Sequence, residues 1–119
     1  MQRYRDLEVW KRSHALVLRI YQLTKSFPDD ERFGLTSQLR RAVVSVPANI
    51  AEGSKRTTNQ DFARFLNISE GSLSETDYLL LCSKDLGYLS DSDLEPIASE
   101  IDEISRMLYR FRTKVEPEG

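Results

Sequence analysis

Apolar residues in the segment from 94 to 115 recur at alternating steps of three and four along the chain. The series consists of Leu94, Ile97, Ile101, Ile104, Leu108, Phe111 and Val115. Such spacing gives a helix one continuous apolar face, and it is typical of helices that pack side by side in left-handed bundles. A β-strand would instead alternate apolar and polar residues with a period of two, and no segment of the sequence does so convincingly. The chain is therefore predicted to be all-α.

Three earlier segments also carry apolar residues at helical spacing, and short polar breaks separate them. The expected helices cover about residues 6–26, 36–53, 58–87 and 91–114. Thr36 is positioned to cap the second helix with its hydroxyl, and Gly53 is suited to the left-handed backbone that follows a helix end. Gly87 is expected to end the third helix. Because the connections are short, the simplest fold is an antiparallel up-down-up-down four-helix bundle, with residues 1–119 forming a single domain.

The second of these segments contains a proline, Pro47, where a helix interior is expected. Proline cannot donate a hydrogen bond to the carbonyl of Val43, and inside a helix it costs ~3 kcal/mol or more unless its surroundings compensate. We therefore expect the second helix to be kinked at Pro47. A polar stripe accompanies the proline on one face of that helix, and it consists of Gln38, Arg41, Ser45, Asn49 and Glu52.

The third segment offers a complement to this stripe. Gly71 and Ser72 remove side-chain bulk where a neighbouring helix could approach closely, and Glu75 follows one turn later. Hydrogen bonds or an ion pair from Arg41 or Asn49 to Ser72 or Glu75 would fix the register between the two helices. We interpret this constellation as structural, with a ligand site as the alternative. Its members are Gln38, Ser45, Pro47, Asn49, Glu52, Gly53, Gly71, Ser72 and Glu75.

Charge is distributed unevenly along the chain, although the net value is only −2. Residues 1–64 hold 12 Lys or Arg against 7 Asp or Glu, a net +5, whereas residues 65–119 hold 5 against 12, a net −7. A polyanion such as RNA or DNA should therefore bind through the first half. The candidate nucleic-acid-binding residues are Lys11, Arg12, Arg19, Arg40, Arg41, Lys55, Arg56 and Arg64. The alternative is that the two halves complement each other within a bundle or between subunits.

The sequence gives no support to a catalytic or metal site. Its single histidine, His14, has no glutamate three residues before it, so the Glu-x-x-His pairs of a di-iron bundle are absent. Its glycines are isolated and form no phosphate-binding loop. We therefore expect no cofactor, no metal and no enzymatic activity. Because no apolar run approaches the ~20 residues that cross a bilayer and the N-terminus lacks a signal peptide, we expect a cytoplasmic protein without a membrane partner.

Short motifs spread over nearly the whole chain occur in a fixed order. They are Leu7–Lys11, Phe27-Pro28, Glu31–Leu35, Gln38–Ala42, Ser45–Gly53, Phe65–Ile68 and Gly71–Glu75. With these motifs the chain resembles the bacterial family of four-helix-bundle proteins encoded in 23S rRNA intervening sequences. The string from Asn49 to Gly53 is the most specific part of the resemblance. The chain departs from the family pattern at Ser69-Glu70, where an alanine and a basic or small residue are more usual.

The resemblance implies an antiparallel four-helix bundle that assembles as a ring-like homopentamer. It also implies similarity in fold to the accessory variability proteins of diversity-generating retroelements, which bind reverse transcriptase and nucleic acid, and it implies no enzymatic activity. Combined with the charge pattern, it predicts a homo-oligomeric, non-catalytic adaptor that binds RNA or DNA weakly and without strong sequence specificity. A protein-binding scaffold without a nucleic-acid role is the alternative, and an unrecognised enzyme is the third interpretation.

Overall fold

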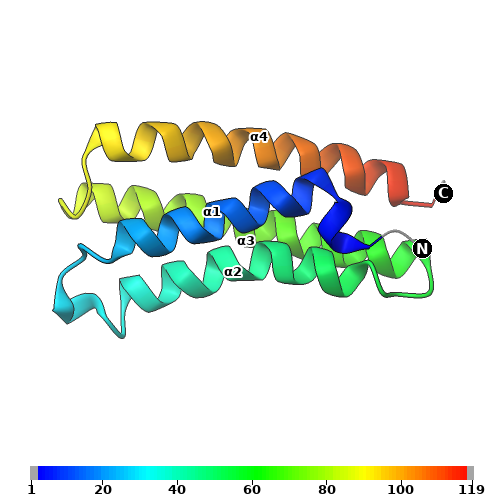
Figure 1. Cartoon of the computed structure of the whole chain (residues 1–119), viewed down its shortest axis with the longest axis horizontal. Helices are drawn as coiled ribbons and strands as arrows, with labels where there is room; N and C mark the ends of the chain where they lie inside the picture. The colour runs from blue at the N-terminus through cyan, green and yellow to red at the C-terminus, as the bar shows by residue number, and fades with distance from the viewer. Residues whose placement is uncertain (1–2, 118–119) are drawn as a thin grey trace.

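Four long helices joined by short connections account for most of the computed structural model, which describes residues 3–117 (Figure 1). In chain order these are α1 (Glu8–Thr24), α2 (Leu35–Gly53), α3 (Asn59–Asp85) and α4 (Asp91–Val115), with 3-10 turns η1 (Tyr4–Asp6) and η2 (Asp29–Glu31) before α1 and α2. No strand occurs within the described range, so the all-α prediction is confirmed. The predicted domain also includes residues 1, 2, 118 and 119, which lie outside the described residues.

Each helix packs against two others. Both α1 and α3 contact α2 and α4, and the contact between α2 and α3 is the most extensive, while that between α1 and α4 is the smallest. Figure 1 shows successive helices running in opposite directions, with both ends of the chain at the same end of the bundle. The molecule is thus a four-helix bundle with two layers, α1–α2 and α3–α4. Within residues 3–117 no helix combines the length and the apolar character needed to cross a membrane.

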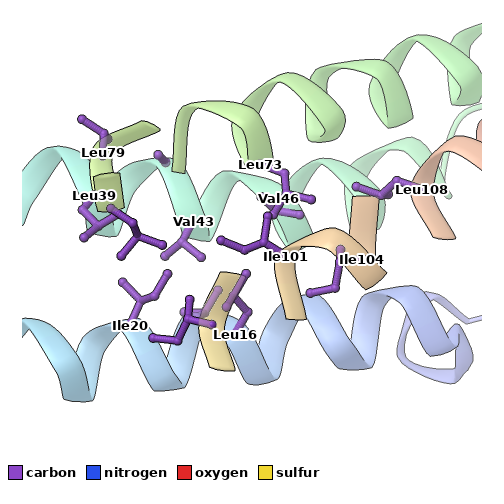
Figure 2. Close-up of a cluster of buried hydrophobic side chains, with 14 of the residues drawn as sticks. Leu16, Ile20, Leu39, Val43, Val46, Leu73, Leu79, Ile101, Ile104 and Leu108 are labelled. Atoms are coloured by element: carbon purple, nitrogen blue, oxygen red, sulfur yellow. The ribbon is translucent and has the colours of Figure 1, made fainter. Parts of the chain in front are cut away.

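The core is formed by the apolar faces that the helical spacing predicts. Figure 2 shows side chains from all four helices pointing toward one another in the interior. The largest fully buried side chains include Leu16, Ile20, Leu39, Ile50, Leu66, Leu73, Leu80, Ile104 and Leu108. Because each such side chain contributes about 1.5–3 kcal/mol when it leaves water, this shared interior is what holds the four helices together.

Helix α2 begins one residue before the predicted start, and the predicted cap is wrong. The helix starts at Leu35, and Thr36 is buried inside its first turn. The Leu35 N–H donates instead to the carboxylate of Glu31, at 3.1 Å from N to Oε1. The first N–H groups of a helix lack partners within the helix, and a carboxylate suits them because the helix dipole favours negative charge there.

The other helix ends fall within two residues of the predicted positions. Thr58 caps α3 by accepting a hydrogen bond from the Asp61 N–H at 3.1 Å, and Ser90 caps α4 in a reciprocal arrangement with Asp93. Gly87 has a φ of 83° after the end of α3. This is a left-handed conformation at the residue that was predicted to end the third helix, and glycine adopts it without steric cost.

Candidate nucleic-acid interface

The contact between α2 and α3 carries the predicted polar motif, but with different partners. The Ser45 and Ser72 hydroxyls are 2.8 Å apart and form the bond between the helices. The Asn49 amide donates to the carbonyl and the hydroxyl of Ser45, at 2.8 and 2.9 Å, and so orients that hydroxyl. The direct link thus comes from Ser45 rather than from Arg41 or Asn49. Within the described residues Glu75 is exposed and makes no hydrogen bond or ion pair, so its predicted link is not formed.

A second bond crosses the same contact beside Pro47. Helix α2 continues through this proline, and a bend of its axis there stays a prediction. The Ser69 hydroxyl, fully buried on α3, donates to the carbonyl of Val46 at 2.8 Å. Ser69 was not among the predicted residues, although its spacing from Leu66 and Leu73 places it on the buried face of α3. A buried hydroxyl needs such a partner, and here the partner belongs to the neighbouring helix.

The close approach of α2 and α3 occurs at Gly53 rather than at Gly71. A β-carbon on Gly53 would lie 2.6 Å from the β-carbon of Phe65, so only glycine lets the two helices come this near. Gly53 is the last residue of α2 and has no positive φ, so the predicted left-handed conformation is wrong. Gly71 lies on the exposed side of α3, where an added β-carbon would meet no atom within 4 Å. Its predicted role in close packing is therefore wrong as well.

The same contact extends beyond the helices to Glu31 and Tyr88. The Tyr88 hydroxyl donates to Glu31 Oε2 at 2.8 Å, while the other carboxylate oxygen accepts from the Leu35 N–H. The bond from Leu35 and then the bond from Tyr88 lower the pKa of the Glu31 carboxyl, and the bond to Glu31 raises the pKa of Tyr88.

The contacts across this interface follow one order: residue numbers rise along α2 as they fall along α3, from Glu31 with Tyr88 to Gly53 with Phe65. This is the pattern of two antiparallel helices in a single register.

The remaining members of the predicted stripe face outward. Arg41 donates to the Ser37 hydroxyl on its own helix, at 3.0 and 3.3 Å, and Glu52 pairs with Arg56 at 2.8 Å. Gln38 is exposed. The stripe is thus divided between an inner pair that faces α3 and outer residues that are open to solvent.

Folding turns the uneven charge of the sequence into two layers of opposite sign. Helices α1 and α2 contain two acidic residues, Glu8 and Glu52, against five Lys or Arg. Helices α3 and α4 contain 11 acidic residues against six Lys or Arg. A surface of one sign attracts a partner of the opposite sign and steers its approach. The outward residues of α1, α2 and the loop after α2, which we call the α1–α2 face, are therefore the part of the molecule suited to a polyanion.

Within residues 3–117, five of the eight predicted basic residues form no ion pair. These are Lys11, Arg19, Arg40, Arg41 and Lys55. The other three are compensated by carboxylates. Arg12 lies 3.7 Å from Glu100 and 3.9 Å from Glu103, both on α4, while Arg56 and Arg64 have acidic neighbours in sequence at 2.8 and 3.5 Å. The uncompensated residues therefore supply most of the positive field on the α1–α2 face.

The basic residues form separate groups rather than one patch. Arg40 and Arg41 lie in the first half of α2, and Arg41 is about 18 Å from the end of that helix at 1.5 Å per residue. Arg56 and Arg64 lie at that far end, where both guanidinium groups are 4.6 Å from the centroid of the Phe65 ring. A bound polyanion that touches both groups must therefore run along α2.

The aromatic side chains beside Arg40 and Arg41 were not among the predicted site residues. The guanidinium of Arg40 is 4.6 Å from the centroid of the Tyr21 ring and donates to the Thr24 hydroxyl at 2.9 Å. The Phe33 ring is 87% exposed, with the guanidinium of Arg32 at 5.2 Å from its centroid. One feature of the sequence could have identified Phe33. It is an aromatic residue in the connection before α2, outside the apolar spacing of the helices. Within the described residues no group of three or more His, Cys, Asp or Glu is placed to hold a metal ion.

Comparisons with known proteins agree with the fold. The family model of the 23S rRNA-intervening sequence protein matches residues 5–110. A crystal structure of a protein with unknown function from the S23 ribosomal protein family of Bacteroides thetaiotaomicron is 28% identical; the match covers 87% of this chain and 97% of that chain, with a TM-score of 0.81. No curated protein matches the chain. Because the family model spans most of the sequence, and the motifs predict the same relationship, this protein belongs to the 23S rRNA-intervening sequence protein family.

Proposed function

We propose that this protein is a non-catalytic, homo-oligomeric adaptor that binds RNA or DNA weakly through its α1–α2 face. The observation that carries the proposal is the contrast in charge between the two layers. The two acidic residues of α1 and α2 each lie within ion-pair distance of an arginine, whereas Arg40, Arg41 and Lys55 have no such partner within the described residues. Contacts from Lys and Arg to phosphates position a nucleic acid without reading its bases, so sequence specificity should be low.

Salt dependence should identify this mode of binding. Each phosphate that a cationic side chain neutralises releases counterions, and the slope of log K against log salt is about −0.9 per contact for a duplex and about −0.7 for a single strand. The net charge of −2 opposes the approach of a polyanion and keeps the affinity of one chain modest. Several copies on one strand multiply a weak contact through effective concentration.

The direct test compares two double charge reversals. Arg41→Glu/Lys55→Glu changes the α1–α2 face, and it leaves Arg40 in place because that residue is bonded to Thr24. We expect it to abolish binding to a labelled 20-nucleotide RNA or DNA in low salt. Arg110→Glu/Lys114→Glu makes the same change of charge at exposed positions of α4, and it should bind almost as the wild type does. If the wild type binds neither nucleic acid in low salt, the protein-binding scaffold is the better function.

Self-association is part of the proposal and is supported by the family resemblance and by α3. Large apolar side chains on α3 and directly after its end are exposed, each between 41 and 63% accessible; they are Ile68, Tyr78, Leu81 and Leu86. Exposed apolar side chains gathered on one element are typical of interaction surfaces. Analytical ultracentrifugation should give a mass five times that of the 13.8 kDa chain. Tyr78→Glu/Leu81→Glu should lower that mass, and a wild type that sediments as a monomer would contradict this part of the proposal.

A further inference from the structure

An open cleft of about 420 Å³ lies between the second half of α1 and the start of α2. Its lining includes Tyr21, Arg32, Phe33, Arg40, Arg41 and Val44, and we call it the Phe33 cleft. The lining combines aromatic and apolar walls with three arginines, and none of its residues is acidic. Figure 1 shows the connection between α1 and α2 at the end of the bundle opposite both chain termini.

The exposure of Phe33 points to a flat, unsaturated partner. This ring is the most exposed large apolar side chain in the described part of the chain, at 87%. It contributes nothing to the core, and a guanidinium, that of Arg32, already lies 5.2 Å from its centroid. Aromatic rings beside basic side chains are the surface on which proteins stack the bases of single-stranded nucleic acid.

Two of the three arginines of the cleft are held in position before any partner arrives. The Arg40 side chain donates to the Thr24 hydroxyl at 2.9 Å and to the carbonyl of Tyr21 at 3.3 Å. The Arg41 guanidinium is bonded to Ser37 at 3.0 Å. Neither has a carboxylate within ion-pair distance among the described residues. Their charges are therefore available to phosphates, and little side-chain freedom is lost when a ligand binds.

The acidic side chain of Glu31 does not compete for these arginines. Glu31, in the turn that precedes Phe33, uses its two carboxylate oxygens to accept hydrogen bonds from the Leu35 N–H and the Tyr88 hydroxyl. The bonds point this carboxylate toward the start of α2 and the loop after α3. Charge complementarity in the cleft therefore favours an anionic partner rather than an apolar segment of another subunit.

We propose that the Phe33 cleft selects single-stranded nucleic acid, an inference that rests on the proposed function above. An unpaired base stacks on the Phe33 ring, and neighbouring phosphates of the same strand contact Arg40 and Arg41. In a duplex the bases are stacked on one another and cannot reach the ring, so a duplex contacts only the cationic groups of the α1–α2 face. The cleft thus adds a preference for single-stranded over double-stranded nucleic acid. It adds no preference for sequence, because every base has an aromatic surface.

The experiment measures whether binding depends on the presence of bases. Fluorescence anisotropy in low salt compares a thymidine 20-mer, an abasic 20-mer with the same number of phosphates, and a 20-base-pair duplex. The wild type should bind the thymidine 20-mer about 10-fold more tightly than the abasic strand, the effect of roughly one stacked base. Equal affinity of the wild type for these two strands would overturn the inference while leaving the proposed function intact. Absence of binding to all three would overturn both.

The variants assign the base dependence to one ring. Phe33→Ala removes an exposed side chain and should reduce the preference for thymidine to nearly 1-fold, with the affinity for the abasic strand unchanged. Phe33→Trp should restore the preference, and Tyr109→Ala, which removes an aromatic ring 57% exposed on α4, should leave it at the wild-type value. If Phe33→Ala weakens binding to both strands equally, the inference fails. It fails also if that variant lowers the sedimenting mass and leaves the base dependence intact, since the cleft would then be a subunit contact.

Discussion

The α2–α3 and α1–α4 contacts lie on opposite sides of the same bundle and are built from different side chains. The α2–α3 contact is crossed by short polar groups at partly or fully buried positions, as between Ser45 and Ser72, and by a glycine that admits Phe65. The α1–α4 contact is bordered by long charged groups, among them Arg12 and Glu100, whose side chains are 40% and 30% exposed.

The difference shows which kind of polar group can fix how two helices sit together. A buried hydroxyl has no water to replace its partner, so a shift of the helices leaves it unsatisfied at a cost of about 1–3 kcal/mol. A long ion pair at the surface can re-form in several geometries, and water competes with it, so its contribution is typically about 0–1 kcal/mol. The α2–α3 contact therefore specifies the register of its two helices, whereas the α1–α4 contact tolerates a shift of one helix along the other.

The largest effect is expected from Gly53→Ala. The added β-carbon would lie 2.6 Å from that of Phe65, so the helices must separate or shift. We expect the free energy of unfolding to fall by about 1–3 kcal/mol, the usual cost of overpacking, as measured by urea denaturation. Gly71→Ala is the matched control, because its β-carbon meets open space, and it should raise stability by about 0.5–1 kcal/mol through helix propensity. Effects of the same sign at both glycines would contradict the assigned close approach.

Ser69→Ala tests the buried hydroxyl in the same contact. The variant loses the 2.8 Å bond to the Val46 carbonyl, and we expect the free energy of unfolding to fall by about 0.5–1.5 kcal/mol. Ser105→Ala, at an exposed position of α4, serves as the control and should change the melting temperature little. A neutral result for Ser69→Ala would mean that packing at Gly53, and not hydrogen bonding, fixes the register.

A double-mutant cycle with Arg12→Met and Glu100→Gln measures the strength of an ion pair at the α1–α4 contact. The coupling free energy should be below about 1 kcal/mol, because both side chains are partly exposed, and it should fall further in 1 M NaCl. Thermal melts of the four proteins give the value. A coupling as large as the effect of Ser69→Ala would remove the distinction between the two contacts.

Glu31→Gln tests whether the α2–α3 contact extends to its outer end. The pKa of Glu31 is lowered in the fold from an ordinary value of 4.5, so the ionised carboxylate stabilises the fold above that value. This contribution is lost as the pH falls through 4.5 and then through the lowered pKa. Urea midpoints between pH 6 and pH 3 should therefore fall less steeply for Glu31→Gln than for the wild type. Asp30→Asn is the control, and an unchanged slope in Glu31→Gln would exclude the linkage.

The elements of the fold were predictable because they depend on local spacing. The apolar series from Leu94 to Val115 identifies the buried face of α4 whatever its neighbours are, and all of its positions are buried or partly buried in the core. The pairing of residues between helices was less predictable. Whether Gly53 or Gly71 lies in a contact depends on how each helix is rotated about its axis, and sequence spacing does not give that rotation.

The residues of the candidate site also differ in how well the sequence predicts them. Arg40 and Arg41 could be identified from charge, because exposure is the ordinary state of arginine. Phe33 could not, because an aromatic residue near a core is expected to be buried, and its 87% exposure is a property of the turn that carries it. The ion pairs of Arg12 with α4 were also beyond the sequence, since they join residues about ninety positions apart.

The contacts along α2 and α3 are nested, and this arrangement suggests an order of folding. The contact of Gly53 with Phe65 encloses the shortest loop, and that of Glu31 with Tyr88 encloses the longest. Each inner contact shortens the free loop that the next one must close, and short loops close at the lowest entropic cost. The hairpin of α2 and α3 can therefore close from its turn outward, before α1 and α4 dock onto it. We expect its amides to exchange with solvent last and those along the α1–α4 edge to exchange first.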